Sequence, residues 1–467
     1  MPETPITLLQ GENHGIETDY RDLLPVNMYP VMKEVLGAQG YMMAYSGLDL
    51  FATGNGIDRG GFYNDREAEH FRVSGTKFIS VSTSGKVTNL GNIAGTGQAS
   101  MPYSFNTQAI IVNLRMFLYD SSGGFREVTD TDLGDPIDGI WVNSVYFLTD
   151  GEYIYHTDVA DEESIDPLKF ATAEFMPDKS LGISKTQDNK VMVWGRYTVE
   201  YFIDIRADVP DTNFGFQRVE NRAQKIGIVS THAKTEISDT WFIVGGRKDE
   251  SVSVHAVSVG GAQKIATREV DKILEQYTEP ELSDIRVESR TEKGTTFVIF
   301  NLPNETLCFM PTMGSWIVLK TGLDDNAIYR GINGIFDARI GKWVYGDRFN
   351  GNLGLLDDTI FTQYDSNPQE WILYSPLLKL ESQSIDSVEI ETIPGFNDEG
   401  DASVFISLTY NAVTYGTEII ADYGSAGDYA QRFIKRRLGY VSDNVGFKFR
   451  GATRSKMAFG LFRIKHA

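Results

Sequence analysis

The stretch Val73-Ser74-Gly75-Thr76-Lys77-Phe78-Ile79-Ser80-Val81 is followed, after a Ser84-Gly85 turn, by Lys86-Val87-Thr88-Asn89-Leu90. Short runs of β-branched and aromatic residues with turn residues between them predict adjacent strands. The same pattern returns downstream, where Tyr146-Phe147-Leu148 is followed by Asp150-Gly151 and Tyr153-Ile154-Tyr155. An Asp-Gly pair between two such runs predicts a β-hairpin.

This strand pattern continues at spacings of roughly 8 to 15 residues, with no alternation of strands and helices. Glycine supplies 45 of 467 residues, above the usual share of about 7%. A sandwich, a barrel and a propeller all fit, and we favour an all-β propeller over residues 45–365 because the pattern persists so long. No WD-type or kelch-type signature occurs, so the repeat is degenerate and six or seven blades are expected. Further strand runs are residues 110–112, 116–119, 141–142, 191–194, 199–203, 241–244, 252–257, 297–300 and 316–319.

One segment has a helical period. Val270, Ile273, Leu274 and Tyr277 stand at i, i+3, i+4 and i+7, which predicts an amphipathic helix near residues 267–280 that lies on the β body. Pro280 is expected to end this helix.

After residue 365 the pattern changes to longer alternating runs, residues 387–393 and 402–410, and then to a Gly-rich stretch and a basic end. These runs predict a separate C-terminal β-sandwich. The expected division is therefore an N-terminal arm with first strands at 1–44, the propeller at 45–365 and the sandwich at 366–467.

The charge is distributed unevenly along the chain. The formal net charge is −21 and the sequence pI is near 4.8, which repels the phosphate backbone of nucleic acid. Residues 431–467, however, hold ten Lys/Arg and one acid, so this segment is about +9 and the remainder about −30. Such asymmetry is typical of an interaction face.

The basic end contains an alternating run, Phe447-Lys448-Phe449-Arg450, which as a strand places both aromatics in the core and both cations outward. A solvated surface is the plain alternative. We expect instead that this face docks against an acidic protein surface, because arginine and aromatic residues are enriched at interfaces. The candidate interaction residues are Arg432, Lys435, Arg436, Arg437, Lys448 and Arg450.

Catalytic and cofactor signatures were not found. The sequence contains no P-loop, dinucleotide-binding, nucleophile-elbow or zinc-protease motif, and its six histidines lack metal-ligand spacing. Asp130-Thr131-Asp132-Leu133-Gly134-Asp135 resembles the start of a calcium loop, but glycine occupies the fifth position, so an acidic turn is expected. Cys308 is the one cysteine and is expected to be a buried hydrophobe. We expect no enzyme, cofactor or metal, and no signal or membrane-spanning segment.

Several blocks of sequence lie along the whole chain: residues 18–28 with 33–36 and 40–41, then 91–101, 198–202, 318–325 with 329–331, 415–418, 435–439 and 446–450. In this order they resemble the packaged-DNA stabilisation proteins, or tail hubs (nozzles), of short-tailed Salmonella-type bacteriophages. No block is a catalytic fingerprint, and their shared order along the chain makes the resemblance specific. Departures lie around residues 205–260 and 380–405.

This resemblance implies a structural virion protein of the podovirus tail, made in the host cytoplasm. The family's hub is a propeller that forms a six-fold homo-oligomeric ring below the portal and its adaptor. It retains packaged DNA, seats a needle or plug beside tailspikes or fibres, and forms the channel for ejection without sequence-specific DNA binding. The alternative is a tail protein that binds or cleaves surface glycan, because carboxylate pairs can arise among 64 acidic residues.

Overall fold

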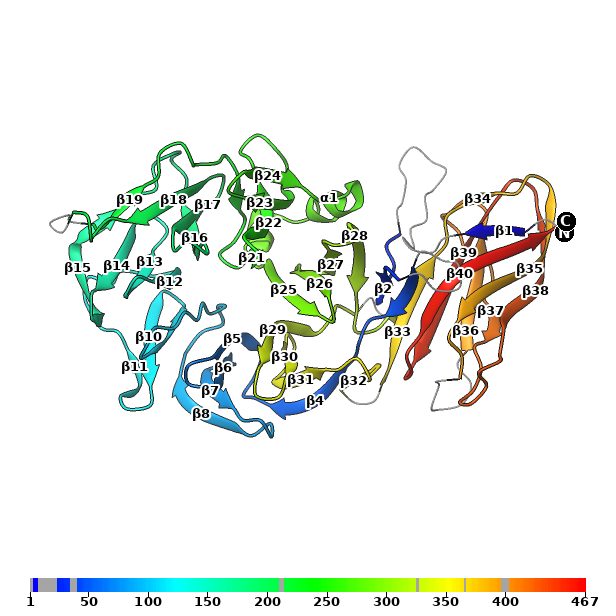
Figure 1. The fold of residues 1–467 in the computed structure, drawn as a ribbon, viewed down its shortest axis with the longest axis horizontal. Coiled ribbons are helices and arrows are strands. Elements are labelled where there is room, and N and C mark those ends of the chain that lie inside the picture. The colour runs from blue at the N-terminus through cyan, green and yellow to red at the C-terminus, as the bar shows by residue number, and fades with distance from the viewer. Residues whose placement is uncertain are drawn as a thin grey trace.

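The computed structural model describes residues 3–6, 23–33, 40–209, 214–324, 327–364, 367–395 and 403–467. Within these ranges the chain forms forty strands and two short helices. Figure 1 shows a ring of small sheets between β4 and β31, with a packed pair of sheets beside it that holds β1 and β40. The predicted all-β fold, a propeller with a C-terminal sandwich, is confirmed.

In the described residues, seven sheets follow one another around the ring (Figure 1). The first contains β5 (Asp58–Asn64), β6 (Glu69–Ser74), β7 (Lys77–Val81) and β8 (Val87–Asn92); the second β9 (Gln108–Val112), β10 (Arg115–Asp120) and β11 (Gly124–Glu127); the third β12 (Asp138–Val142), β13 (Val145–Thr149), β14 (Ile154–Asp158) and β15 (Asp161–Ala171). The fourth contains β16 (Ser180–Lys185), β17 (Val191–Gly195), β18 (Val199–Asp204) and β19 (Phe216–Arg218).

The remaining propeller sheets continue the series. The fifth contains β20 (Gly227–Ile228), β21 (Lys234–Ile237), β22 (Thr240–Gly246), β23 (Ser253–Ser258) and β24 (Gly261–Lys264), and the sixth contains β25 (Arg286–Glu292), β26 (Thr295–Asn301), β27 (Thr306–Met310) and β28 (Ser315–Leu319). The seventh contains β29 (Gly331–Asp337), β30 (Lys342–Asp347), β31 (Asn352–Leu356) and β4 (Leu48–Thr53).

The last sheet is completed by a strand from the start of the propeller. β4 precedes β5 in sequence, yet it pairs antiparallel with β31, from Leu48 opposite Leu356 to Thr53 opposite Asn352. β5 and β29, the first strands of the first and seventh sheets, also lie side by side. Because β4 leads directly into β5, its backbone hydrogen bonds to β31 join the first sheet to the seventh.

Each sheet buries both of its faces against its neighbours. A separate hydrophobic cluster fills each junction between consecutive sheets: for example, Ile111, Tyr146 and Leu148 lie between the second and third. Cys308 lies fully buried in the cluster between the sixth and seventh sheets, as predicted. Repeated two-sided burial explains why apolar runs recur so regularly in the sequence.

Short turns set the register of many hairpins. The Asp150-Gly151 turn joins β13 and β14, which confirms the predicted hairpin. Two-residue turns elsewhere have positive φ at both positions but contain no glycine: Asn113-Leu114 has φ of 52° and 61°, and Asn143-Ser144 has 44° and 70°. Such angles are those of the mirror-image turns that match strand twist.

The sandwich combines both ends of the described chain. One sheet has the order β2 (Met28–Val31), β3 (Tyr41–Ala44), β40 (Ala458–His466), β35 (Gln383–Thr392) and β38 (Phe433–Val441), with β1 (Glu3–Ile6) paired to β40. The facing sheet has the order β33 (Asn367–Tyr374), β39 (Asn444–Thr453), β36 (Ser403–Thr409) and β37 (Ile419–Asp422), with β34 (Leu378–Lys379) on β39 and β32 (Thr362–Gln363) between β33 and β4. Trp371, Phe447, Phe459 and Phe462 are fully buried between them.

The predicted helix forms only in part. α1 (Arg268–Leu274) buries Val270 and Leu274, but it ends before Tyr277. Pro280 does not end it and instead lies in the first turn of α2 (Glu279–Leu282), where Thr278 forms a capping box with Glu281. Proline is tolerated there because the first-turn N–H groups lack intrahelical acceptors.

Candidate interaction surfaces

The six candidate interaction residues lie on two sheets rather than one. β38 carries Lys435, Arg436 and Arg437, with Arg432 just before it, whereas Lys448 and Arg450 belong to β39. β38 is an edge strand of one sandwich sheet, and β39 lies in the facing sheet. The basic residues are thus divided between the two sides of the sandwich.

On β39 the predicted alternation is confirmed. Phe447 and Phe449 are fully buried, and the alternating cations Lys448 and Arg450 point outward. Arg450 donates two hydrogen bonds to the Glu418 carboxylate, at 2.9 and 2.7 Å, and its guanidinium lies over the Phe405 ring. The ammonium of Lys448 lies 5.1 Å from the Tyr415 ring centre. These two cations therefore hold residues 415–418 against the sandwich.

On the β38 side, two cations are also engaged within the chain. Arg432 donates two hydrogen bonds of 2.7 Å to the Glu389 carboxylate. Lys435 donates to the backbone oxygen of Ile420 at 2.9 Å and so bridges the edges of the two sheets.

Arg436 and Arg437 differ from the other four. Both are exposed, and neither has an ion-pair partner among the residues that the structure describes. The strand bulges here, with φ of 59° at Arg437 and 97° at Gly439, and Tyr440 beyond it is 59% exposed. Arg436, Arg437 and Tyr440, which we term the basic strand end, are the part of the predicted surface available to a partner.

The middle of the propeller is filled by hydrogen-bonded side chains. Asp138 of the third sheet accepts from Lys234 of the fifth sheet at 3.0 Å and from the Ser100 hydroxyl at 2.6 Å. Asn333 of the seventh sheet donates to Asp58 of the first at 2.7 Å. These bonds join the innermost strands of different sheets, so polar side chains pair with one another across the propeller centre.

A buried chain of polar groups links the first and seventh sheets. The Arg72 guanidinium is fully buried and donates to Asp58 at 2.8 Å, to Nε2 of His70 at 3.0 Å and to the Val344 carbonyl at 2.5 Å. Nδ1 of His70 then lies 3.1 Å from Asp337. Burial lowers the pKa of His70 to about 4, against the opposing hydrogen bond to Asp337, so the imidazole is neutral near pH 7.

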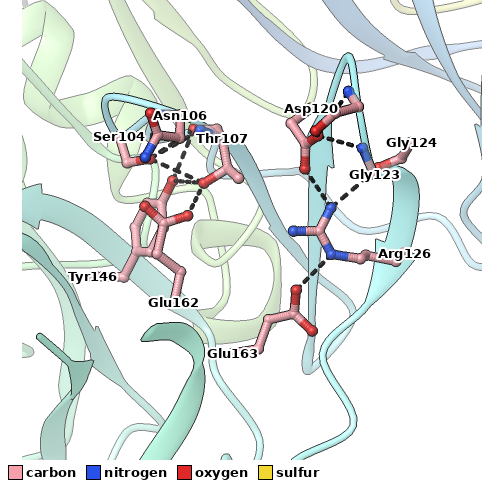
Figure 2. Close-up of polar contacts among 11 residues, drawn as sticks. Ser104, Asn106, Thr107, Asp120, Gly123, Gly124, Arg126, Tyr146, Glu162 and Glu163 are labelled. Carbon is pink, nitrogen blue, oxygen red and sulfur yellow. Dashed lines mark hydrogen bonds and ion pairs between the residues drawn. The ribbon is translucent and has the colours of Figure 1, made fainter. Parts of the chain in front are cut away.

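At the outer rim, β15 clamps the third sheet to the second (Figure 2). Glu162 accepts from the Thr107 hydroxyl, and Glu163 accepts from Nε of Arg126 at 2.5 Å. Arg126 also donates to Asp120 at 2.6 Å. Hydrogen bonds from the Ser122 hydroxyl, the Gly123 N–H and Arg126 hold the pKa of Asp120 well below its usual range. The carboxylates of Asp120, Glu162 and Glu163 are therefore all engaged in hydrogen bonds within the chain.

An open groove of about 590 Å³ lies beside this rim. Phe62, Tyr103, Phe105 and Trp141 line it, and Arg66 lies over the Phe105 ring at 5.5 Å. Phe105 is 62% exposed. This groove is not predictable from the sequence, because its aromatic residues come from separate loops and strands and share no local spacing.

The described ranges contain no group of three or more His, Cys, Asp or Glu side chains that could hold a metal ion. Burial raises the pKa of the Cys308 thiol to about 12, so it is not a nucleophile near pH 7. Asp130-Thr131-Asp132 forms an acidic turn, in which Asp130 accepts from the Asp132 N–H at 2.8 Å. In the described parts of the chain, neither helix has the length and apolar character needed to span a membrane.

Two family profiles match nearly the whole chain. Residues 4–361 match the family described as bacteriophage P22 Gp10, beta-propeller, and residues 370–467 match bacteriophage P22 Gp10, beta-sandwich. Among curated proteins, the tail hub protein gp10 of Salmonella phage P22 is 28% identical over 482 residues, covering 100% of both chains.

Solved structures give weaker likenesses. The WD40 domain of Neurospora crassa Pan2 aligns with a TM-score of 0.42 and 10% identity, covering 68% of this chain and 97% of that one. The extracellular domain of BT4673 from B. thetaiotaomicron aligns with a TM-score of 0.42 and 10% identity, covering 77% of this chain and 44% of that one. The chain spans less than half the length of that second protein, and neither likeness carries an argument about function.

Proposed function

Because the chain belongs to the bacteriophage P22 Gp10 family and is a structural tail hub protein rather than an enzyme, we propose that its copies form a ring below the portal and its adaptor. The observation that carries this proposal is the match of both domains, in order, over the full chain. A hub of this kind retains packaged DNA and later forms the channel through which the genome leaves. Six copies, as in the resemblance noted above, complete the ring.

The path of DNA in this proposal lies between copies. Side chains pair across the centre of each propeller, Asp138 with Lys234 and Asn333 with Asp58, which supports a path for duplex DNA outside the single chain. A net charge of −21 supports a lumen that is predominantly acidic. Such a wall repels phosphates and lets DNA slide without sequence-specific binding.

The neighbours of the ring follow from the same assignment. The chain is a component of the phage tail. We propose that the ring contacts the adaptor above it, a needle or other plug that closes the channel, and tailspikes or fibres at its side. We also propose that the chain is made in the host cytoplasm before the tail assembles.

The domain division proposed here places the propeller at 45–365 and the sandwich at 366–467, with an arm at 1–44. The boundary residues 365–366 and the arm residues 7–22 and 34–39, which carry part of the family resemblance, lie outside the described residues. β2 and β3 support an arm that belongs structurally to the sandwich. The basic sandwich residues, Arg436 and Arg437 foremost, are proposed to contact an acidic protein surface.

Deletion of the chain from its phage tests the proposal. Particles that lack it are expected to package DNA and then lose it, so the DNA of purified particles becomes nuclease-sensitive. Supplying the intact chain in trans restores protection, and reconstruction of the restored tail shows a ring below the adaptor. Particles that lack the chain yet keep protected DNA and complete tails contradict the proposal.

A further inference from the structure

Two segments of the chain carry opposite charge. Residues 127–166 contain twelve Asp/Glu and no Lys/Arg, and residues 431–467 contain ten Lys/Arg and one acid. The acidic segment ends in β15 and the basic segment begins at β38. Figure 1 places these strands at opposite ends of the longest axis. The basic segment of one copy is therefore complementary in charge to the acidic segment of a second copy placed head to tail.

The acidic end contains a shallow groove with an apolar floor. It measures about 200 Å³, and Leu133, Tyr153, Tyr155 and Phe170 are among its lining residues. Tyr153 and Phe170 meet edge to face at 5.1 Å, and Phe170 is 49% exposed. Exposed aromatic surface of this kind is usual at protein contacts.

Carboxylates surround this floor. Asp132, Asp150 and Asp166 line the groove, and we term the feature formed by these three with Leu133, Tyr153 and Phe170 the acidic groove. Asp132 is exposed, and none of the described cations forms an ion pair with it. Glu152, next to Tyr153, is also exposed. Carboxylates beside aromatic rings suit guanidinium groups, which accept stacking on their faces and donate to oxygens from their edges.

The basic strand end supplies groups of that kind. Arg436 and Arg437 are exposed and have no ion-pair partner among the described residues, whereas Arg432 and Arg450 are already held by Glu389 and Glu418. Tyr440 adds an exposed ring. The surface thus offers two available guanidinium groups and one aromatic side chain at the far end of the molecule from the acidic groove.

We infer that neighbouring copies of this chain contact each other head to tail, with the basic strand end of one copy seated in the acidic groove of the next. This inference rests on the proposed ring and identifies the surfaces that form it. A contact between two different surfaces of one chain is heterologous, and it closes into a ring when the rotation per copy allows. Because the contact is charged, its association rate is sensitive to salt.

Two double variants test the contact on tail particles assembled in cells that supply the chain in trans. One carries Asp132→Lys and Glu152→Lys, which place two positive charges at the acidic groove opposite the arginines of the next copy. The other carries Arg436→Glu and Arg437→Glu, which place two negative charges at the basic strand end opposite the carboxylates of the next copy. Each alone is expected to reduce incorporation about tenfold or more, because like charges then face each other across the contact.

Co-expression of the two variants is the decisive arm. In an alternating ring every positive end meets a negative one, so incorporation returns toward the parent level with the two chains in equal amounts. A cysteine pair gives a second readout: Asp132→Cys on one chain and Arg437→Cys on another are expected to form an intermolecular disulfide when purified assembled tails are treated with oxidised glutathione, which accepts the two electrons. Buried Cys308 does not compete for it.

A matched control reverses two exposed propeller lysines, Lys86→Glu with Lys248→Glu. It changes the net charge as much as the arginine reversal and is expected to incorporate normally, and all variants are checked for parental melting temperature. If both end variants incorporate normally, or if each fails and mixing restores nothing, the head-to-tail contact is wrong while the ring itself stands. If the parent chain forms no ring in tails, the proposed function fails instead.

Discussion

Asn27 and Lys320 exchange two hydrogen bonds across the joint between the arm and the propeller. The side-chain amide of Asn27 donates to the Lys320 carbonyl at 2.9 Å, and its oxygen accepts from the Lys320 N–H at 3.0 Å. The same amide also donates to the Glu370 carbonyl in the sandwich, at 2.7 Å. One fully buried side chain therefore ties together the propeller and the sandwich.

Replacing Asn27 by alanine is expected to weaken this joint. The change leaves buried backbone groups without partners, at about 1–3 kcal/mol of unfolding free energy. Alanine also disfavours the φ of 53° found there, which adds about 1 kcal/mol. Asn27→Gly keeps the backbone angle accessible and should lose less stability. Chemical denaturation and limited proteolysis between the domains measure both variants; equal melting of Asn27→Ala and the parent contradicts the role.

The buried pair of Asp58 and Arg72 gives a second prediction. Asp58→Asn preserves the side-chain shape but leaves the Arg72 guanidinium, which is fully buried, without its anion. Breaking such a pair typically costs about 3–5 kcal/mol. Urea unfolding is expected to show this loss. The exposed pair of Arg115 and Glu127 is the control, since Glu127→Gln should cost under about 1 kcal/mol.

His70 makes stability depend on pH. Its pKa is about 4 in the folded chain and near 6.5 when unfolded, so the unfolded state takes up a proton first as pH falls. The neutral imidazole makes its full contribution to the free energy of unfolding above pH 6.5. This contribution falls by about 3 kcal/mol in total as the pH drops toward 4. Urea unfolding between pH 7 and 4 should show this slope, and His70→Gln should flatten it. An unchanged slope in that variant contradicts the assignment.

The basic residues of the sandwich should separate into two groups. Arg436→Gln with Arg437→Gln is expected to leave the unfolding free energy within about 0.5 kcal/mol of the parent, but to slow assembly, most strongly at low salt. Lys448→Gln with Arg450→Gln removes the contacts to Tyr415 and Glu418. It should cost about 1 kcal/mol and leave the assembly rate unchanged. Stopped-flow or time-resolved incorporation at two salt concentrations measures the difference, and identical behaviour of the two pairs contradicts it.

Local patterns predicted the strands well because turn chemistry and side-chain alternation are local properties. The Asp150-Gly151 hairpin and the inward Phe447 and Phe449 were both predicted from a few neighbouring residues. Alternation does not say which sheet a strand joins, however. It therefore could not separate β38 from β39, and the six candidate cations were expected on one face.

Long-range pairing explains the other omissions. The position of the arm depends on Asn27 meeting Lys320 and Glu370, more than 290 positions later in the sequence. The aromatic groove and the acidic groove likewise join residues from separate strands. Turns such as Asn143-Ser144 were missed because they lack glycine, although asparagine tolerates positive φ.

The pairing of β4 with β31 also constrains how the chain is made. β4 leaves the ribosome early, but its partner between Asn352 and Leu356 is synthesised almost at the end of the propeller. Until β31 is made, the edge of β4 has no partner strand, and the sheets between them are not yet held in a closed ring. Contacts of such long sequence separation slow folding and expose strand edges to misassembly. Ribosome stalling before residue 352 should therefore trap a protease-sensitive, aggregation-prone intermediate, and release of the complete propeller should be the step at which protection appears.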